Sequence, residues 1–198
     1  MSLPSREDLA KLPSRAIVAY AVRCARRVES RYAAAMSHRQ DLVAAVGRAI
    51  RQAERFASGE DTVVEGAVAD AADGAARAAH AEAVADVADA AARAAHAAAR
   101  AVHAAVDAAH AAGDAAHVTT HTAHAAAFAA SFAAFAAADA PSAAAYVRAT
   151  NNDFQRLTDL ARAGEDLAIS LSEDGPLGPL WPNGASQAQS SPHSAEHG

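Results

Sequence analysis

A seven-residue unit repeats through the middle of this chain, between residues 70 and 141, and it restricts the possible folds more than any other feature. Most units hold a charged residue, two alanines, a histidine or aspartate, and further alanines. The units begin at Asp70, Arg77, Asp86, Arg93, Arg100, Asp107, Asp114, His121, Phe128 and Phe135. Alanine has the highest helix propensity, and seven residues return to nearly the same side of a helix. The repeat therefore predicts helix with its polar side chains on one stripe.

Large apolar side chains are scarce in this region. Leu, Ile, Val and Phe together make up 32 of the 198 residues, and no Leu, Ile or Met occurs between Ile50 and Leu157. The net charge of −6 is small, so self-repulsion does not force the chain to expand. We expect an ordered all-α protein. Its core should be concentrated at residues 17–50 and 146–171, while the middle packs through alanine.

Apolar periodicity and capping residues predict three helices outside the repeat. The first should run from Ser14 to about residue 35, the second over residues 40–58 up to Gly59, and the last over residues 141–163 up to Gly164. The residues expected to face inward are Ile17, Ala21, Cys24, Val28 and Tyr32 in the first, Val43, Val46, Ile50, Ala53 and Phe56 in the second, and Tyr146, Val147, Phe154, Leu157 and Ala161 in the last. The short link at residues 36–39 predicts an antiparallel hairpin.

The alanine-rich region should divide into more than one helix. Thr62 and Glu65 have capping-box spacing, so a helix should begin there. Two extra residues, Val84 and Ala85, shift the phase of the repeat. An unbroken helix would far exceed its neighbours in length, so we expect an antiparallel helical bundle or hairpin array of about five helices. The expected organisation is a flexible leader at 1–13, a helical bundle at 14–164 and an extended or disordered tail at 165–198.

Composition excludes several classes of protein. Cys24 is the only cysteine, so no intrachain disulfide is expected, and its place in an apolar stripe predicts a buried thiol. The N-terminus lacks an apolar signal region, and no apolar run is long enough to span a membrane. The acidic balance argues against a nucleic-acid partner. We expect a cytoplasmic protein.

The histidines of the repeat allow a plain and a sharper interpretation. The polar stripe from residue 86 predicts a solvated helix face, in which Asp and His pairs give small support. His117, His121 and His124 lie at i, i+4 and i+7, so adjacent pairs are weak candidates for binding zinc or nickel. We expect no other cofactor. A pH response and a coiled-coil seam are further options, and the latter is disfavoured by polar groups at every seam position. At Phe128 and Phe135 the stripe becomes aromatic, which predicts that it enters the core or meets a partner there.

Four arginines and one tryptophan are candidates for binding a partner. The arginines are Arg23, Arg26, Arg27 and Arg31. We expect them to form a solvated helix face balanced by Glu29 and Asp41, and the alternative is that they bind an acidic partner helix. Trp181 stands between prolines. It should either dock the tail onto the bundle or serve as a short motif for another protein.

Two segments resemble a group of uncharacterised alanine-rich helical bacterial proteins. The first reads AIVAYAVRCARRV at residues 16–28, and the second reads SEDGPLGPLWPNG at residues 172–184, after DFQRLTDLA. In that group an alanine-rich helical middle separates the same two blocks. The resemblance implies a shared architecture and no named activity. The histidine-rich middle and the final QAQSSPHSAEHG depart from it.

No phosphate-binding loop, nucleophile elbow or metalloprotease motif is present in the sequence. We therefore expect a protein that is not an enzyme but a non-catalytic structural or protein-interaction module, with a protein partner. The alternative is a divalent-metal-binding or buffering helical protein that uses the histidine stripe.

Overall fold

The computed structural model describes residues 2–60, 123, 125–131, 133–134, 140–164, 171 and 174–181. Within these residues 75% are helical, in five helices, and no strand occurs, so the predicted all-α fold is confirmed. The expected helix start at Thr62, the phase shift at Val84 and Ala85, and the histidines from His80 to His121 all lie outside the described residues.

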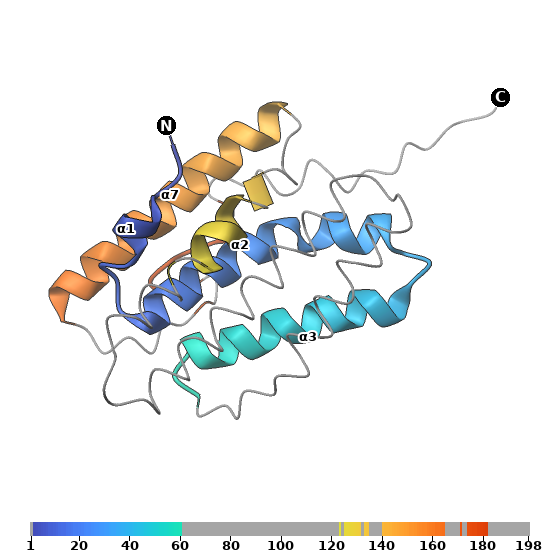
Figure 1. Cartoon of the computed structure of the whole chain (residues 1–198), viewed down its shortest axis with the longest axis horizontal. Coiled ribbons are helices and arrows are strands. Elements are labelled where there is room, and N and C mark those ends of the chain that lie inside the picture. Colours follow the sequence, from blue (N-terminus) through green and yellow to red (C-terminus); the bar gives the residue numbers. More distant parts are fainter. Residues whose placement is uncertain are drawn as a thin grey trace.

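A helical hairpin forms the centre of the described structure. Helix α2 (Ser14–Ala35) and helix α3 (Gln40–Ala57) lie side by side and run in opposite directions, joined by the turn at residues 36–39 (Figure 1). Both bounds agree with the sequence prediction to within a residue. Gly59 ends the hairpin with a φ of 82°, a left-handed conformation that glycine adopts without strain.

The predicted inward stripes of the hairpin are confirmed. All five stripe residues of α2 are buried. On α3, Val46, Ile50 and Ala53 are buried, while Val43 and Phe56 are partly buried against the same core. Isoleucine, valine and alanine side chains at helical spacing thus hold α2 against α3.

Helix α7 (Ala140–Ala163) lies on the other side of α2, so that α2 is the middle helix of three (Figure 1). Tyr146 and Leu157 are buried, and Val147, Phe154 and Ala161 are partly buried. The helix ends at Gly164, whose φ is 68°. Tyr20 of α2 meets Phe154 edge to face, with ring centroids 6.5 Å apart.

Alanine packs the described part of the end of the alanine-rich region. Among the helical residues described between 123 and 134, the buried side chains are those of Ala123, Ala126, Ala129, Ala130 and Ala133. The Tyr146 hydroxyl donates a hydrogen bond of 3.1 Å to the carbonyl of Ala130. The small side chains let the backbone come close enough to α7 for this bond.

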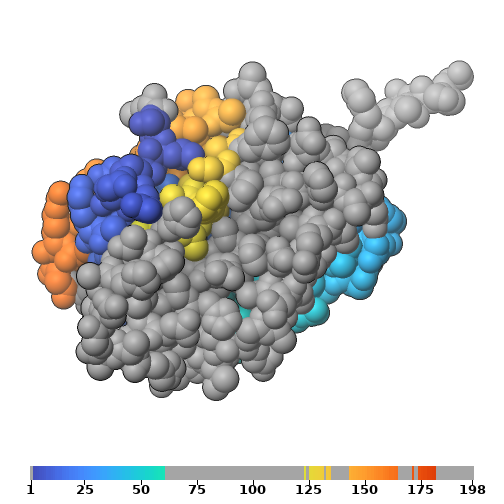
Figure 2. Space-filling model, viewed as in Figure 1, coloured from blue at the N-terminus to red at the C-terminus, as the bar shows by residue number. Residues whose placement is uncertain are grey.

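The N-terminal residues carry an element that the sequence analysis did not predict. It treats residues 1–13 as a flexible leader, yet helix α1 (Arg6–Leu9) begins there with a capping box, in which Asp8 N–H donates to Ser5 Oγ and Ser5 N–H to Asp8. Leu9 is fully buried and Leu12 is 4% exposed. Figure 2 shows these residues, in blue, beside α7, in orange.

Candidate functional site

Helix α2 has a second buried face, and that face carries charge. Arg23 and Arg27 are only 3% and 4% exposed, although the sequence analysis expects a solvated arginine face. That expectation is wrong for these two residues because α2 lies between two helices and has little free surface. Their side chains extend toward α7 and the C-terminal residues 174–181.

One carboxylate neutralises part of this charge. Asp153 of α7 accepts hydrogen bonds at Oδ2 from Arg23 Nε at 2.9 Å and from Arg27 Nη2 at 2.6 Å. All three side chains are at least 96% buried, so solvent does not screen their interaction. Two guanidinium groups share one carboxylate, which leaves the buried arginine cluster, Arg23, Arg27 and Asp153, with a net positive charge.

Further donors of the cluster bind main-chain oxygen. We name residues 174–181 the C-terminal segment. Arg23 donates to Gly178 O at 3.0 Å, to Pro179 O at 2.8 Å and to Leu177 O at 3.5 Å, and Arg27 donates to Leu180 O at 3.0 Å. Arg156 of α7 also donates to Leu177 O. Four consecutive carbonyls are thus bound by arginine, which offers only donors.

Two side chains of the C-terminal segment complete the contact. Leu177 is 1% exposed and belongs to the main core, and the ring of Trp181 packs against that core with Arg27 Cζ 5.8 Å from its centroid. Of the two roles considered for Trp181, docking onto the bundle is therefore the one observed. Gly178 has a φ of 64°, and a Cβ there would lie 2.5 Å from Arg156 Nη1. The left-handed backbone at residue 178 and its closeness to the Arg156 side chain both favour glycine there.

Arg26 has a different role from its neighbours. It binds both carboxylate oxygens of Glu54 on α3, at 2.7 and 2.5 Å, and Glu29 on its own helix. Its pKa is raised, chiefly by the hydrogen bond to Glu54. Glu29 is thus a partner of this group, as the sequence suggests, whereas Asp41 pairs with Arg39 instead.

A buried hydroxyl and thiol group lies next to the arginine cluster. Cys24 is a fully buried free cysteine, as predicted, and it neighbours Tyr20, Tyr146 and Thr150. Burial raises the pKa of the Cys24 thiol to about 11, and burial likewise raises the pKa of both tyrosines. At neutral pH these groups stay protonated, so the thiol is not an activated nucleophile.

The structure does not test the three histidines predicted as weak metal ligands. His117, His121 and His124 lie outside the described residues. Among the residues that the structure does describe, no group of three or more His, Cys, Asp or Glu side chains could hold a metal ion.

The stripe that carries the histidines reaches the described residues at Phe128 and Ser131. Phe128 is 46% exposed and Ser131 is also exposed, while the alanines between them are buried. Phe128 therefore does not enter the core, and the alternative, that the stripe meets a partner there, stays a prediction. Phe135 lies outside the described residues.

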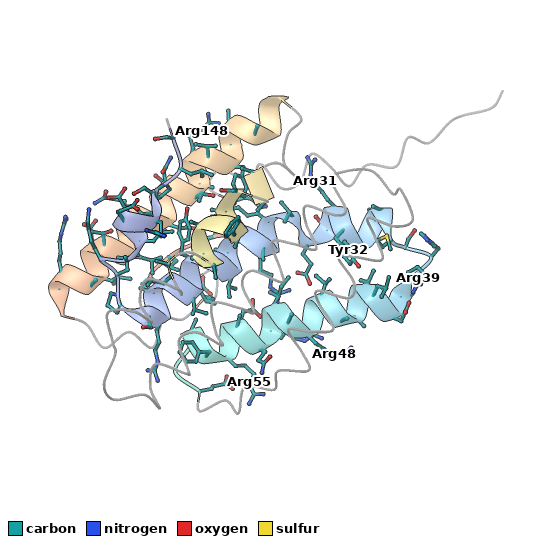
Figure 3. The ribbon with its side chains drawn as sticks, in the orientation of Figure 1. Arg31, Tyr32, Arg39, Arg48, Arg55 and Arg148 are labelled. Carbon is teal, nitrogen blue, oxygen red and sulfur yellow. The ribbon has the colours of Figure 1, made fainter. Side chains whose placement is uncertain are left out.

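Three further arginines of the described helices are exposed. Arg48 and Arg55 extend from the side of α3 that faces away from α2, and Arg148 extends from α7 (Figure 3). Arg55 pairs with Glu60 at 2.6 Å. These three arginines thus differ from Arg23 and Arg27, which are buried.

No protein-family model, curated protein or solved structure matches the chain. Within the described ranges, none of the helices has the length and apolar character needed to cross a bilayer. The buried arginine cluster and its bound segment are therefore the features from which a function must be argued.

Proposed function

We propose that the protein is a non-catalytic cytoplasmic module with a structural or protein-interaction role. The observation that carries the proposal is the use of its buried charges: Arg23, Arg27 and Asp153 bind one another and the main chain of residues 177–180. Catalytic acids and bases need access to a substrate. These groups instead join α2, α7 and the C-terminal segment into one unit.

The buried thiol supports the same interpretation. Cysteine reacts as its thiolate, which forms readily when nearby positive charge or a helix terminus lowers the pKa. Burial has the opposite and larger effect at Cys24, whose pKa rises to about 11. We therefore assign Cys24 to packing.

The resemblance noted in the sequence gives the proposal a physical basis. Its two blocks, residues 16–28 and 172–184, contain the donors and the acceptors of the same hydrogen bonds: Arg23 and Arg27 in the first, the carbonyls of 177–180 in the second. We infer that proteins with both blocks share this contact.

Metal binding through the histidine stripe is the second candidate. Beyond the histidines, the same stripe includes residues 128 and 131, and both are exposed. Exposed histidine pairs leave most of the coordination shell to water, so they bind zinc weakly. Calorimetric titration with Zn²⁺ should show several weak sites on the wild type and on a His121→Ala variant. A single submicromolar site that this variant loses would favour the metal-binding candidate.

The interaction role is tested with the tagged full-length chain. A pull-down from a lysate of the source organism should capture a protein in near-stoichiometric amount, and the purified pair should bind again in isolation. Turnover of a small molecule with no captured partner would contradict the proposal.

A further inference from the structure

The main chain of the C-terminal segment is bound in the way a receptor binds a peptide. Its carbonyls at residues 177–180 accept hydrogen bonds from Arg23 and Arg27, and one leucine side chain is buried. Main-chain hydrogen bonds combined with a few side-chain anchors are the usual basis of peptide recognition. We propose that the surface of α2 and α7 around Arg23 and Arg27 is a peptide-binding site. Residues 174–181 are its built-in ligand, and a proline-containing segment of a partner protein displaces them. This inference rests on the proposed interaction function and specifies the partner's chemistry.

The contacts define which ligand the site accepts. Arginine offers donors only, and proline offers a carbonyl but no N–H, so Pro179, whose carbonyl Arg23 binds, suits the site. Leu177 fills the core, and Trp181 lies over the guanidinium of Arg27. The ligand class is therefore a short segment with a tight turn, in which a leucine is flanked by Pro and Gly and followed by an aromatic residue.

The built-in ligand is attached in a way that permits its release. Its hydrogen bonds to the described helices run from arginine side chains to carbonyls, and its described main-chain pair is internal, from Gly178 N–H to Gly175 O. Only one of its side chains, Leu177, is fully buried. The nine residues 165–173 separate it from α7, and nine residues span up to about 30 Å when extended. The segment can therefore leave without unwinding α7.

The site also retains unused binding capacity. Nη1 of Arg27 is buried, and none of the residues that the structure describes accepts a hydrogen bond from it. The cluster holds two guanidinium groups against one carboxylate. A partner segment that supplies one more oxygen, and above all a carboxylate, would gain a charge-assisted hydrogen bond that residues 174–181 do not make. This gain gives a partner the means to compete with the tethered segment.

Fluorescence anisotropy with a labelled peptide tests the proposal. The peptide is SEDGPLGPLWPNG, residues 172–184, and a scrambled peptide is the control. It is added to the full-length wild type, to Leu177→Asp, and to Leu177→Asp combined with Arg23→Gln. The first substitution should expel the built-in ligand, because a carboxylate is unfavourable at the buried position of Leu177, and circular dichroism checks that the helices are retained. The second removes the donor to three of its carbonyls.

We expect the peptide to bind Leu177→Asp at least tenfold more tightly than the wild type, because a tethered ligand competes at an effective concentration near millimolar. Adding Arg23→Gln should weaken binding at least tenfold. A folded Leu177→Asp variant that binds no peptide would overturn the proposal. Equal affinity of the peptide for Leu177→Asp with and without Arg23→Gln would also overturn it. If the peptide does not bind Leu177→Asp but a purified partner protein still binds the chain, the proposal of a peptide-binding site is wrong and the proposed interaction function stands.

Wild-type protein provides the second measurement, which guards against a variant that fails to fold. Trp181 is the only tryptophan, so its emission reports on the segment alone. In a urea titration its emission should shift at a lower concentration than the helical circular dichroism signal. Coincident transitions, or loss of helix in Leu177→Asp, would make residues 174–181 part of the cooperative core and overturn the proposal.

Discussion

Arg27 of α2 donates a hydrogen bond of 2.6 Å to the Asp153 carboxylate of α7, and the two side chains are 0% and 4% exposed. Their positions lie 126 residues apart in the sequence. Removing one partner of a buried ion pair costs far more than removing a surface charge, because the other charge stays buried. This pair is therefore the most sensitive point of the fold.

Asp153→Asn should destabilise the protein by roughly 3–5 kcal/mol, since two buried guanidinium groups would lose the one carboxylate that pairs with them in the described part of the chain. Urea unfolding followed by circular dichroism measures the loss. Asp159→Asn on the same helix is the matched control, because that side chain is 61% exposed and the change should cost less than about 0.5 kcal/mol. Equal effects at both positions would show that the buried cluster does not stabilise the fold.

Gly178→Ala should release the C-terminal segment. Alanine at position 178 would have to adopt a left-handed backbone conformation with a φ of 64°, and its Cβ would lie 2.5 Å from Arg156 Nη1. Gly164→Ala is the control, because φ is 68° there and no atom lies within 4 Å of the added Cβ. Both changes should cost about 1 kcal/mol in backbone strain, but only Gly178→Ala should shift the emission of Trp181 to the red. A red shift in both variants would indicate general loosening.

Alkaline pH should destabilise the protein through Cys24. Its pKa rises from 9.0 to about 11 on burial, so the folded state keeps the proton after the unfolded state has lost it. Stability is therefore complete below pH 9 and falls as the pH rises toward 11, by at most roughly 2–3 kcal/mol. Tyr20 and Tyr146, whose pKa values burial also raises, add to the loss above pH 10.

Stability measured from pH 8 to 10 on the wild type and on Cys24→Ala separates these contributions. The free energy of unfolding of Cys24→Ala should stay constant up to about pH 10, where the tyrosines begin to titrate in the unfolded state. A wild type as flat as the variant would show that the thiol is accessible to solvent.

Ile50→Ala should cost roughly 2–5 kcal/mol, because Ile50 is fully buried between α3 and α2. Val43→Ala on the same helix should cost only about 1 kcal/mol, since Val43 is partly exposed. Thermal unfolding of the two variants provides the comparison. A larger loss at Val43 would place the core at the opposite end of the hairpin.

Local sequence signals were sufficient for three helices and their ends. The periodicity of apolar residues and the capping residues predict α2, α3 and α7. Gly59 and Gly164 take the left-handed conformations expected of glycines that end helices. The same capping rule would have found α1, because Ser5 and Asp8 have the required spacing and Leu9 follows. These features depend on neighbours within a few residues, which a sequence displays directly.

The arginine cluster was missed because its partners are far apart in the chain. A single stripe was assigned to α2, which placed Arg23 and Arg27 on a solvated face. The run from Ala16 to Val22 is apolar at every position, however, and such a run indicates a helix that is buried all round. That signal could have revealed that these arginines need buried partners. It could not have identified Asp153 or the carbonyls of 177–180.

The central claim is that the buried arginines hold the C-terminal segment in place, and quenching of Trp181 by acrylamide in Arg27→Lys tests it most directly. Lysine keeps the charge opposite Asp153 but loses the planar group that also binds Leu180 O and lies over the indole. With the helices intact by circular dichroism, we expect the quenching constant to rise at least twofold, and to stay unchanged in the exposed control Arg148→Lys. A quenching constant in Arg27→Lys equal to that of the wild type would contradict the account.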